Sequence, residues 1–215
     1  MRRIFYLLLG FTIVFVGVSL IWRWASRRRQ LPCPSWLAWS LENPLSDLIG
    51  RTTVTLDRIG LRPGEHGLDV GSGPGRLTLP AAERVGPTGV ITAVDVQPEM
   101  LARLRQRMEE KGVTNIRLYQ ADIAADHHLP PSSFDRAWLV TVLGEIPDRA
   151  AALRNIYRLL KAGGALSITE MLGDPHYQRR SEVLRLGQEV GFEPVEYWQS
   201  GLAFTQNFVK NRREQ

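Results

Sequence analysis

Three glycines in five residues, Gly71, Gly73 and Gly75, stand in the stretch LDVGSGPGRL directly after a short apolar run. A turn needs one or two glycines, so this run predicts that something bulky lies against the main chain. The loop after the first strand of an open parallel sheet is a usual cradle for a phosphate or carboxylate. A dinucleotide fingerprint needs its third glycine where Arg76 stands, and a Walker loop needs a Gly-Lys-Ser/Thr sequence that does not follow.

Carboxylates follow the next two expected strands. Asp95 stands 24 residues after Gly71, where a carboxylate can accept hydrogen bonds from both hydroxyls of a ribose. Its alternative role is a capping or turn residue ahead of Pro98. Asp122 ends the strand after that. Because parallel strands finish at the same edge of a sheet, the glycines and both carboxylates together predict a nucleoside site.

The elements that must position these residues alternate between strand and helix. Apolar runs of strand length are separated by segments of helical period, which predicts an α/β fold with a parallel sheet. We expect strands near 66–70, 89–95, 116–120, 134–141 and 164–171, and helices near 75–85, 98–111, 147–161 and 177–190. Pro147 is expected to start its helix and Gly163 and Gly164 to end it. Residues 191–211 predict a hairpin, because only Ser200 and Gly201 separate two strand-like runs, and 42–60 predict a helix on the sheet edge or over the ligand cleft.

On these stretches the chain resembles the class I S-adenosylmethionine-dependent methyltransferases, over about residues 45–210. LDVGSGPGRLTLPAA is similar to their first motif, AVDVQPEML to the second, ADI to the third, and 134–170 to their fourth and fifth strands with the helix between. The resemblance implies a Rossmann-like sheet of seven strands, mostly parallel with the last antiparallel, and S-adenosylmethionine as cofactor. Within the family, the chain looks most like the quinone-methylating and lipid-methylating branch.

The resemblance also implies which residues hold the donor. The glycine loop and Asp69 would hold its methionine end, Asp95 would bind the ribose hydroxyls, and Asp122 with Ile123 would flank the adenine. The whole implied set is Asp69, Gly71, Ser72, Gly73, Gly75, Asp95, Val96, Asp122, Ile123 and Thr141.

Candidate catalytic residues follow the expected fourth and fifth strands. Methyl transfer from a sulfonium is an in-line displacement, for which the protein mainly supplies alignment. A phenol, hydroxyl or enolizable carbon as acceptor would also need a base near the methyl group. Glu145, Glu170 and His176 are the candidates. Capping of the next helix is the alternative for Glu145, and capping or packing is the alternative for His176.

No metal site is expected. The Asp-His-His sequence at 126–128 lies in a proline-flanked polar loop with no partner at ligand spacing, which favours a solvated loop. The single cysteine, Cys33, excludes a cysteine-cluster zinc site. Arg103, Arg105 and Arg107 alternate along one expected helix and are predicted to form its solvent face.

The first forty residues predict a membrane anchor. Residues 4–22 hold 19 uncharged residues, which as a helix extend about 28 Å, close to the hydrocarbon thickness of a bilayer. A secretory signal peptide is the alternative. We expect one transmembrane helix with basic flanks over 1–24, a linker over 25–44 and the methyltransferase domain over 45–215. The basic residues after the run favour a single-pass membrane protein with that domain in the cytoplasm.

Charge and composition limit the partners. The net charge is +5, but residues 1–41 hold six arginines and no acid, which leaves 21 basic and 22 acidic residues for the remainder. The domain therefore lacks a footprint for nucleic acid. The sequence predicts a membrane-anchored methyltransferase acting on a small, apolar or lipid-like acceptor. A non-catalytic donor-binding scaffold and a nicotinamide-dependent reductase are the alternatives, and no oligomeric state is predicted.

Overall fold

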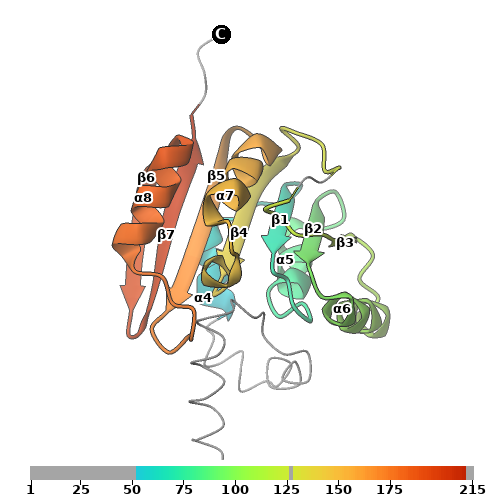
Figure 1. Ribbon diagram of the computed structural model, residues 1–215. Coiled ribbons are helices and arrows are strands. Elements are labelled where there is room, and N and C mark those ends of the chain that lie inside the picture. The colour runs from blue at the N-terminus through green and yellow to red at the C-terminus, as the bar shows by residue number, and fades with distance from the viewer. Residues whose placement is uncertain (1–51, 126–127, 212–215) are drawn as a thin grey trace, which may run out of the picture.

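The computed structural model of the chain describes residues 52–125 and 128–211. Within them, seven strands form one sheet in the order β3-β2-β1-β4-β5-β7-β6 (Figure 1). The strands are β1 (His66–Val70), β2 (Val90–Asp95), β3 (Ile116–Gln120), β4 (Phe134–Val140), β5 (Leu160–Met171), β6 (Phe192–Ser200) and β7 (Ala203–Lys210). Only β7 runs antiparallel to its neighbours, β5 and β6. The expected seven-stranded α/β sheet with an antiparallel last strand is confirmed.

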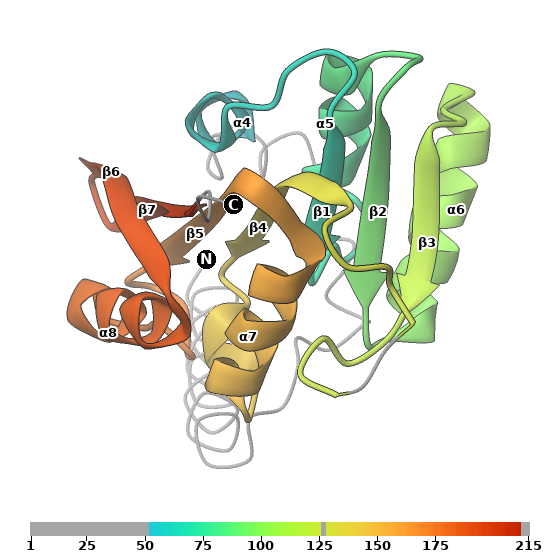
Figure 2. The same cartoon turned by 90° about the horizontal axis from the view of Figure 1, so that it is seen from above.

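Helices cover both faces of the sheet, as the view from above shows (Figure 2). The helices are α4 (Thr52–Ile59), α5 (Thr78–Val85), α6 (Pro98–Lys111), α7 (Arg149–Leu159) and α8 (Arg180–Val190). Side chains of α4, α5 and α6 pack on one face around Ile91 and Trp138, whereas those of α7 and α8 pack on the other around Leu139 and Ile168. The two apolar layers hold the sheet between the helices. Because β1 to β5 are parallel, their carboxyl ends lie at one edge of the sheet.

Helix α7 and strand β5 differ from the sequence prediction at their shared boundary. Asp148, not Pro147, stands at the N-cap, where its carboxylate accepts a hydrogen bond of 2.8 Å from the backbone N–H of Ala151. The helix stops at Leu159, and the expected glycine stop lies inside β5. The register of β5 against β4 shifts between Phe134 and Arg136, and this irregularity accommodates the extra residues. Strand pairing therefore overrides the local glycine signal.

The other boundaries lie close to those expected. Helix α6 matches its prediction, while α5 and α8 each begin three residues later than expected. Helix α4 occupies the end of the segment expected to be helical, and 42–51 lies outside the described residues.

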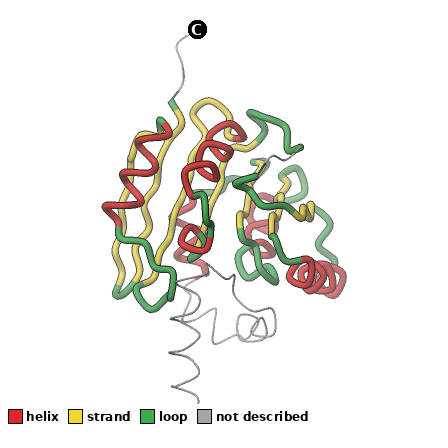
Figure 3. Tube along the Cα trace, in the orientation of Figure 1, coloured by secondary structure: helices red, strands yellow, loops and turns green. Residues whose placement is uncertain are grey.

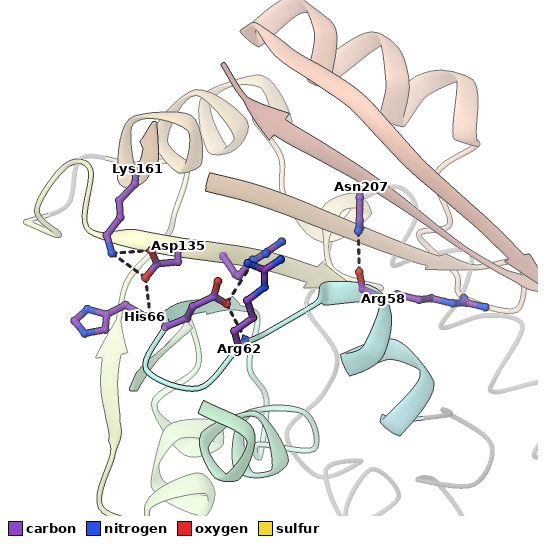
Figure 4. A network of polar contacts seen from close by, with 8 residues as sticks. Arg58, Arg62, His66, Asp135, Lys161 and Asn207 are labelled. Atoms are coloured by element: carbon purple, nitrogen blue, oxygen red, sulfur yellow. Dashed lines mark hydrogen bonds and ion pairs between the residues drawn. The ribbon is translucent and has the colours of Figure 1, made fainter. Parts of the chain in front are cut away.

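Polar contacts close the amino-terminal edge of the sheet (Figure 4). The Asp135 carboxylate accepts hydrogen bonds from Lys161 Nζ, at 2.7 and 2.8 Å, and from the backbone N–H of His66 at 2.8 Å. These bonds join β1, β4 and β5 at the end opposite the glycine loop. Across the sheet, Asn207 Nδ2 donates to the carbonyl of Arg58 at 2.7 Å, which fastens α4 to β7. The Asp135 contacts therefore stabilise the amino-terminal edge, and the Asn207 contact stabilises the packing of α4 on the sheet.

The expected anchor over 4–22 and the boundaries at 24/25 and 44/45 lie outside the described residues. Among the helices of 52–125 and 128–211, none has the length and apolarity that a bilayer crossing requires.

Candidate active site

The tube view shows the loops that connect the strands and helices (Figure 3). A cavity of about 470 Å³ opens at the carboxyl edge of the sheet, among the loops that follow β1 to β5. Nine of the ten donor contacts implied by the sequence line it: Asp69, Gly71, Ser72, Gly73, Asp95, Val96, Asp122, Ile123 and Thr141. The tenth, Gly75, does not. Of the three candidate catalytic residues, the cavity walls include Glu145 but neither Glu170 nor His176.

The three glycines of the first loop have different reasons to be glycine. All three adopt left-handed backbone, with φ of +71° at Gly71, +53° at Gly73 and +87° at Gly75. A side chain on Gly71 would overlap Val142, and one on Gly75 would overlap Leu104. At Gly73 an added Cβ would meet nothing within 4 Å. Two glycines therefore permit close packing of the protein on itself, and only the middle one faces open space.

Asp95 fastens this loop to the end of β2. Its Oδ2 accepts a hydrogen bond of 2.8 Å from the backbone N–H of Gly73, and its Oδ1 accepts one of 2.9 Å from that of Gln97. The side chain lines the cavity although the residue is only 7% exposed. Burial raises the pKa of Asp95, and the backbone donors oppose that rise. Each carboxylate oxygen keeps a second lone pair, so it can also accept a hydroxyl proton.

Asp69, at the end of β1, is a second buried carboxyl of the cavity wall. Thr78 donates to its Oδ2 at 2.6 Å from the first residue of α5. Burial raises the pKa of Asp69 to about 7, although the Thr78 hydrogen bond and the nearby Arg76 lower it. The group therefore changes charge near neutral pH, directly beside the glycine loop.

Two further residues of the wall carry features that ordinary packing does not require. The Ser72 hydroxyl is buried and makes no hydrogen bond within the described structure. Thr141, just past β4, has a φ of +57°, which is rare for a β-branched residue and tends to mark functional sites. Its Oγ1 donates to the carbonyl of Val140 at 2.7 Å. A hydroxyl without a partner and a strained backbone on one wall are consistent with a ligand site.

Glu145 is the candidate base that reaches the cavity. It ends a short 3-10 helix, Leu143–Glu145, between β4 and α7, and is partly buried. The alternative role as a helix cap is wrong, because Asp148 caps α7.

Glu170 and His176 lie behind the wall rather than on it. Glu170 is 1% exposed, its Oε2 accepts a hydrogen bond of 3.1 Å from the backbone N–H of Gln178, and its Oε1 has no partner in the described structure. Burial raises its pKa to about 8, against the effect of that hydrogen bond. The His176 backbone packs so tightly against Gly144 that a side chain there would overlap it. The His176 backbone thus packs on the loop that carries Glu145, and Glu170 holds the backbone at Gln178.

Sequence reasoning missed several residues around the site. Arg107, predicted to face solvent, donates from Nη1 to the carbonyl of Pro74 at 2.8 Å and so holds the glycine loop to α6. Val142, Ile146 and Met171 supply apolar wall. No spacing in the sequence identifies them, because their position depends on how the loops fold.

No metal-binding cluster is present in 52–125 and 128–211, where no three His, Cys, Asp or Glu side chains are grouped suitably. Of the Asp-His-His sequence, residues 126–127 lie outside the described residues.

Comparison with known proteins finds similarity to methyltransferases. The methyltransferase domain family model matches residues 68–164. The ubiquinone/menaquinone biosynthesis C-methyltransferase UbiE of Ectopseudomonas mendocina is 38% identical over 117 residues, which are 54% of this chain and 45% of that protein. A SAM-dependent methyltransferase from Aquifex aeolicus has a solved structure with a TM-score of 0.77 and 20% identity, covering 83% of this chain and 99% of its own.

A second solved structure is the phosphoethanolamine N-methyltransferase 2 of Haemonchus contortus in complex with S-adenosyl-L-methionine. It has a TM-score of 0.66 and 18% identity, covering 76% of this chain and 53% of its own. At such identities a solved structure supports the fold alone. The chain spans about half the length of the curated relatives it matches.

The matched segment contains the glycine loop, Asp95 and Asp122. The predicted resemblance to S-adenosylmethionine-dependent methyltransferases is confirmed.

Proposed function

We propose, from the confirmed resemblance of this chain to class I S-adenosylmethionine-dependent methyltransferases, that it transfers a methyl group from that donor to a small apolar acceptor. The glycine loop carries this proposal most directly. At Gly73 the missing side chain faces open space, and the neighbouring Ser72 hydroxyl is buried without a partner. Open space beside a glycine and a buried hydroxyl without a partner are expected where a bound ligand completes the contacts of a loop.

The described residues fit the donor part by part. Asp95 can accept the ribose hydroxyls while it keeps its two backbone donors. Asp69, when ionised, offers a negative charge to the cationic methionine end. Asp122 and Ile123 line the cavity next to that ribose position and would flank the adenine. When bound, S-adenosylmethionine supplies an electrophilic methyl group, and the walls need only align the acceptor with it.

Glu145 is the residue best placed to accept a proton from the acceptor, because it alone of the three candidates lines the cavity. Glu170 and His176 act as positioning residues behind it. Apolar wall from Val142, Ile146 and Met171 favours an apolar ring over a charged acceptor. The similarity to UbiE proteins supports a quinone-like ring as the first acceptor to test.

The domain limits and the anchor are part of the same proposal. Residues 1–24 would anchor the chain, 25–44 would link, and 45–215 would form the catalytic domain at the cytoplasmic surface of a membrane. The uncharged run at 4–22 and the arginines that follow it support this arrangement. Tethering raises the effective concentration of any acceptor dissolved in the bilayer.

Calorimetric titration of the full chain in detergent micelles tests donor binding. One site for S-adenosylmethionine is expected, weakened at least about tenfold by Asp95→Asn, because an amide oxygen cannot replace both carboxylate oxygens. Asp57→Asn is the matched control, since Asp57 pairs with Arg84 on the surface. Donor binding without transfer of a labelled methyl group to any hydroquinone would favour a scaffold. Binding of NADH in place of the donor would favour a reductase.

A further inference from the structure

Large apolar side chains that are exposed gather at the edge of the sheet that holds the cavity. Of seven such residues in the described part of the chain, five lie there. They are Val54 in the first turn of α4, Val96 after β2, Met171 and Leu172 at the end of β5, and Leu202 in the β6–β7 turn, and we call this set the apolar rim. The other two, Val195 and Tyr197, lie along β6.

Two members of the apolar rim are bonded to each other, and two others line the cavity. The backbone N–H of Leu172 donates to the carbonyl of Leu202 at 2.8 Å, and these side chains are 55% and 67% exposed. Met171 and Val96 both line the cavity, from opposite sides of the glycine loop. The end of β5 and the β6–β7 turn reach the same lower edge in Figure 1. The apolar rim and the cavity wall thus share Val96 and Met171.

The chain enters the described domain at this same edge. Helix α4 starts at Thr52, whose Oγ1 accepts a hydrogen bond of 3.2 Å from Nη1 of Arg76, a residue of the cavity wall. Only residues 23–51 separate this point from the uncharged run at 4–22. A run that inserts in a bilayer would therefore be connected to the domain at the edge that carries the apolar rim.

We propose that the apolar rim rests in the surface of a lipid bilayer, so that an acceptor dissolved in the membrane enters the cavity without crossing water. The inference builds on the proposed function and names the source of its acceptor. An exposed apolar group gains free energy when it leaves water, and patches of such groups mark interaction sites. One weak apolar contact holds a protein poorly on a membrane, but a second signal on the same chain makes it stable.

A fluorescent probe measures this contact directly. In the full chain with Cys33→Ser, which removes the single cysteine, Leu202→Cys places an NBD label on the apolar rim and Val195→Cys places it on β6 as the matched control. Both positions are well exposed, at 67% and 56%. The labelled proteins are reconstituted in phosphatidylcholine vesicles with and without nitroxide-bearing lipids, which quench a label only at membrane depth.

Quenching at position 202 and none at 195 is the expected result. Absence of quenching at 202 on vesicle-bound protein overturns the inference. A blue-shifted but unquenched label at 202 also overturns it, because residues 36–51 or a second copy would then cover the apolar rim. Calorimetry with S-adenosylmethionine on the same samples separates the two proposals: donor binding without quenching refutes only the membrane contact, and quenching without donor binding refutes only the proposed function.

Rates give an independent readout. Leu172→Ser with Leu202→Ser should lower methyl transfer to a long-tailed 1,4-dihydroxynaphthalene in vesicles about tenfold, because two apolar groups no longer enter the bilayer. Transfer to the same ring without a tail, in solution, should stay within about twofold, since neither residue lines the cavity. Val195→Ser with Tyr197→Ser should change neither rate. Equal losses on both acceptors would contradict a role in membrane delivery.

Discussion

The buried carboxyl of Glu170 makes the stability of the protein depend on pH in a direction that can be worked out. Its pKa is raised to about 8 in the fold, from an ordinary value of 4.5. Between these two values the folded state keeps a proton that the unfolded state has lost, so stability falls as pH rises. For one proton the slope is about 1.4 kcal/mol per pH unit, or about 2–3 kcal/mol between pH 5.5 and 7.5.

Glu170→Gln should remove this slope, because an amide does not titrate. Urea unfolding of both proteins across pH 5.5–7.5 measures the free energy of unfolding. Relative to the wild type, that of the variant should rise by about 2–3 kcal/mol from the lower to the higher pH. Asp69 contributes a slope of the same sign, but it is present in both proteins and cancels in the comparison. Glu189→Gln, on the exposed side of α8, should follow the wild type. If the free energies of unfolding of wild type and Glu170→Gln changed in parallel with pH, the carboxyl would be ionised in the fold and the reasoning would be wrong.

Three further changes probe the glycine loop and its carboxyl. Gly73→Ala and Gly112→Ala should each lower the free energy of unfolding by about 1–2 kcal/mol, because both positions have left-handed backbone and open space. Only Gly73→Ala should also weaken binding of the donor, as measured by calorimetry. Donor affinity should rise about tenfold from pH 6 to 8 as Asp69 ionises, and Asp69→Asn should flatten the calorimetric profile. Thr78→Val, which removes the 2.6 Å hydrogen bond, should move the midpoint of that profile to higher pH.

Each of these has an outcome that contradicts it. Equal donor affinity in Gly73→Ala and Gly112→Ala would mean that the donor does not approach the loop. A pH profile that survives Asp69→Asn would assign the titration to another group. A midpoint that stays in place in Thr78→Val would mean that the hydroxyl does not stabilise the ionised carboxyl.

The sequence predicts the sheet because its signals are local. Periodicity of apolar residues locates β1, β3 and α6 at their observed bounds, and the single Ser200–Gly201 break locates the hairpin. Gly163 and Gly164 mislead because a glycine pair ends helices in general, whereas here the pairing of β5 with β4 decides. The donor contacts are predictable for a similar reason. Nine of the ten implied residues line the cavity, because they stand at or just after the ends of strands that the topology brings together.

What the sequence does not predict depends on how loops pack. Arg107 lies on a helix whose charge pattern is that of a solvent face, yet its side chain reaches the carbonyl of Pro74. Glu170 and Glu145 look equivalent along the chain, but Glu170 is buried at 1% exposure whereas Glu145 lines the cavity. Distances between loops, rather than spacing along the chain, separate a base candidate from a positioning residue.

The most direct test is a crystal structure of the full chain with S-adenosylhomocysteine. We predict that the ribose hydroxyls lie within hydrogen-bond distance of Asp95 and that the homocysteine portion lies along the glycine loop at Gly73. A nucleoside bound elsewhere, or an Asp95 side chain turned away from it, would contradict the account.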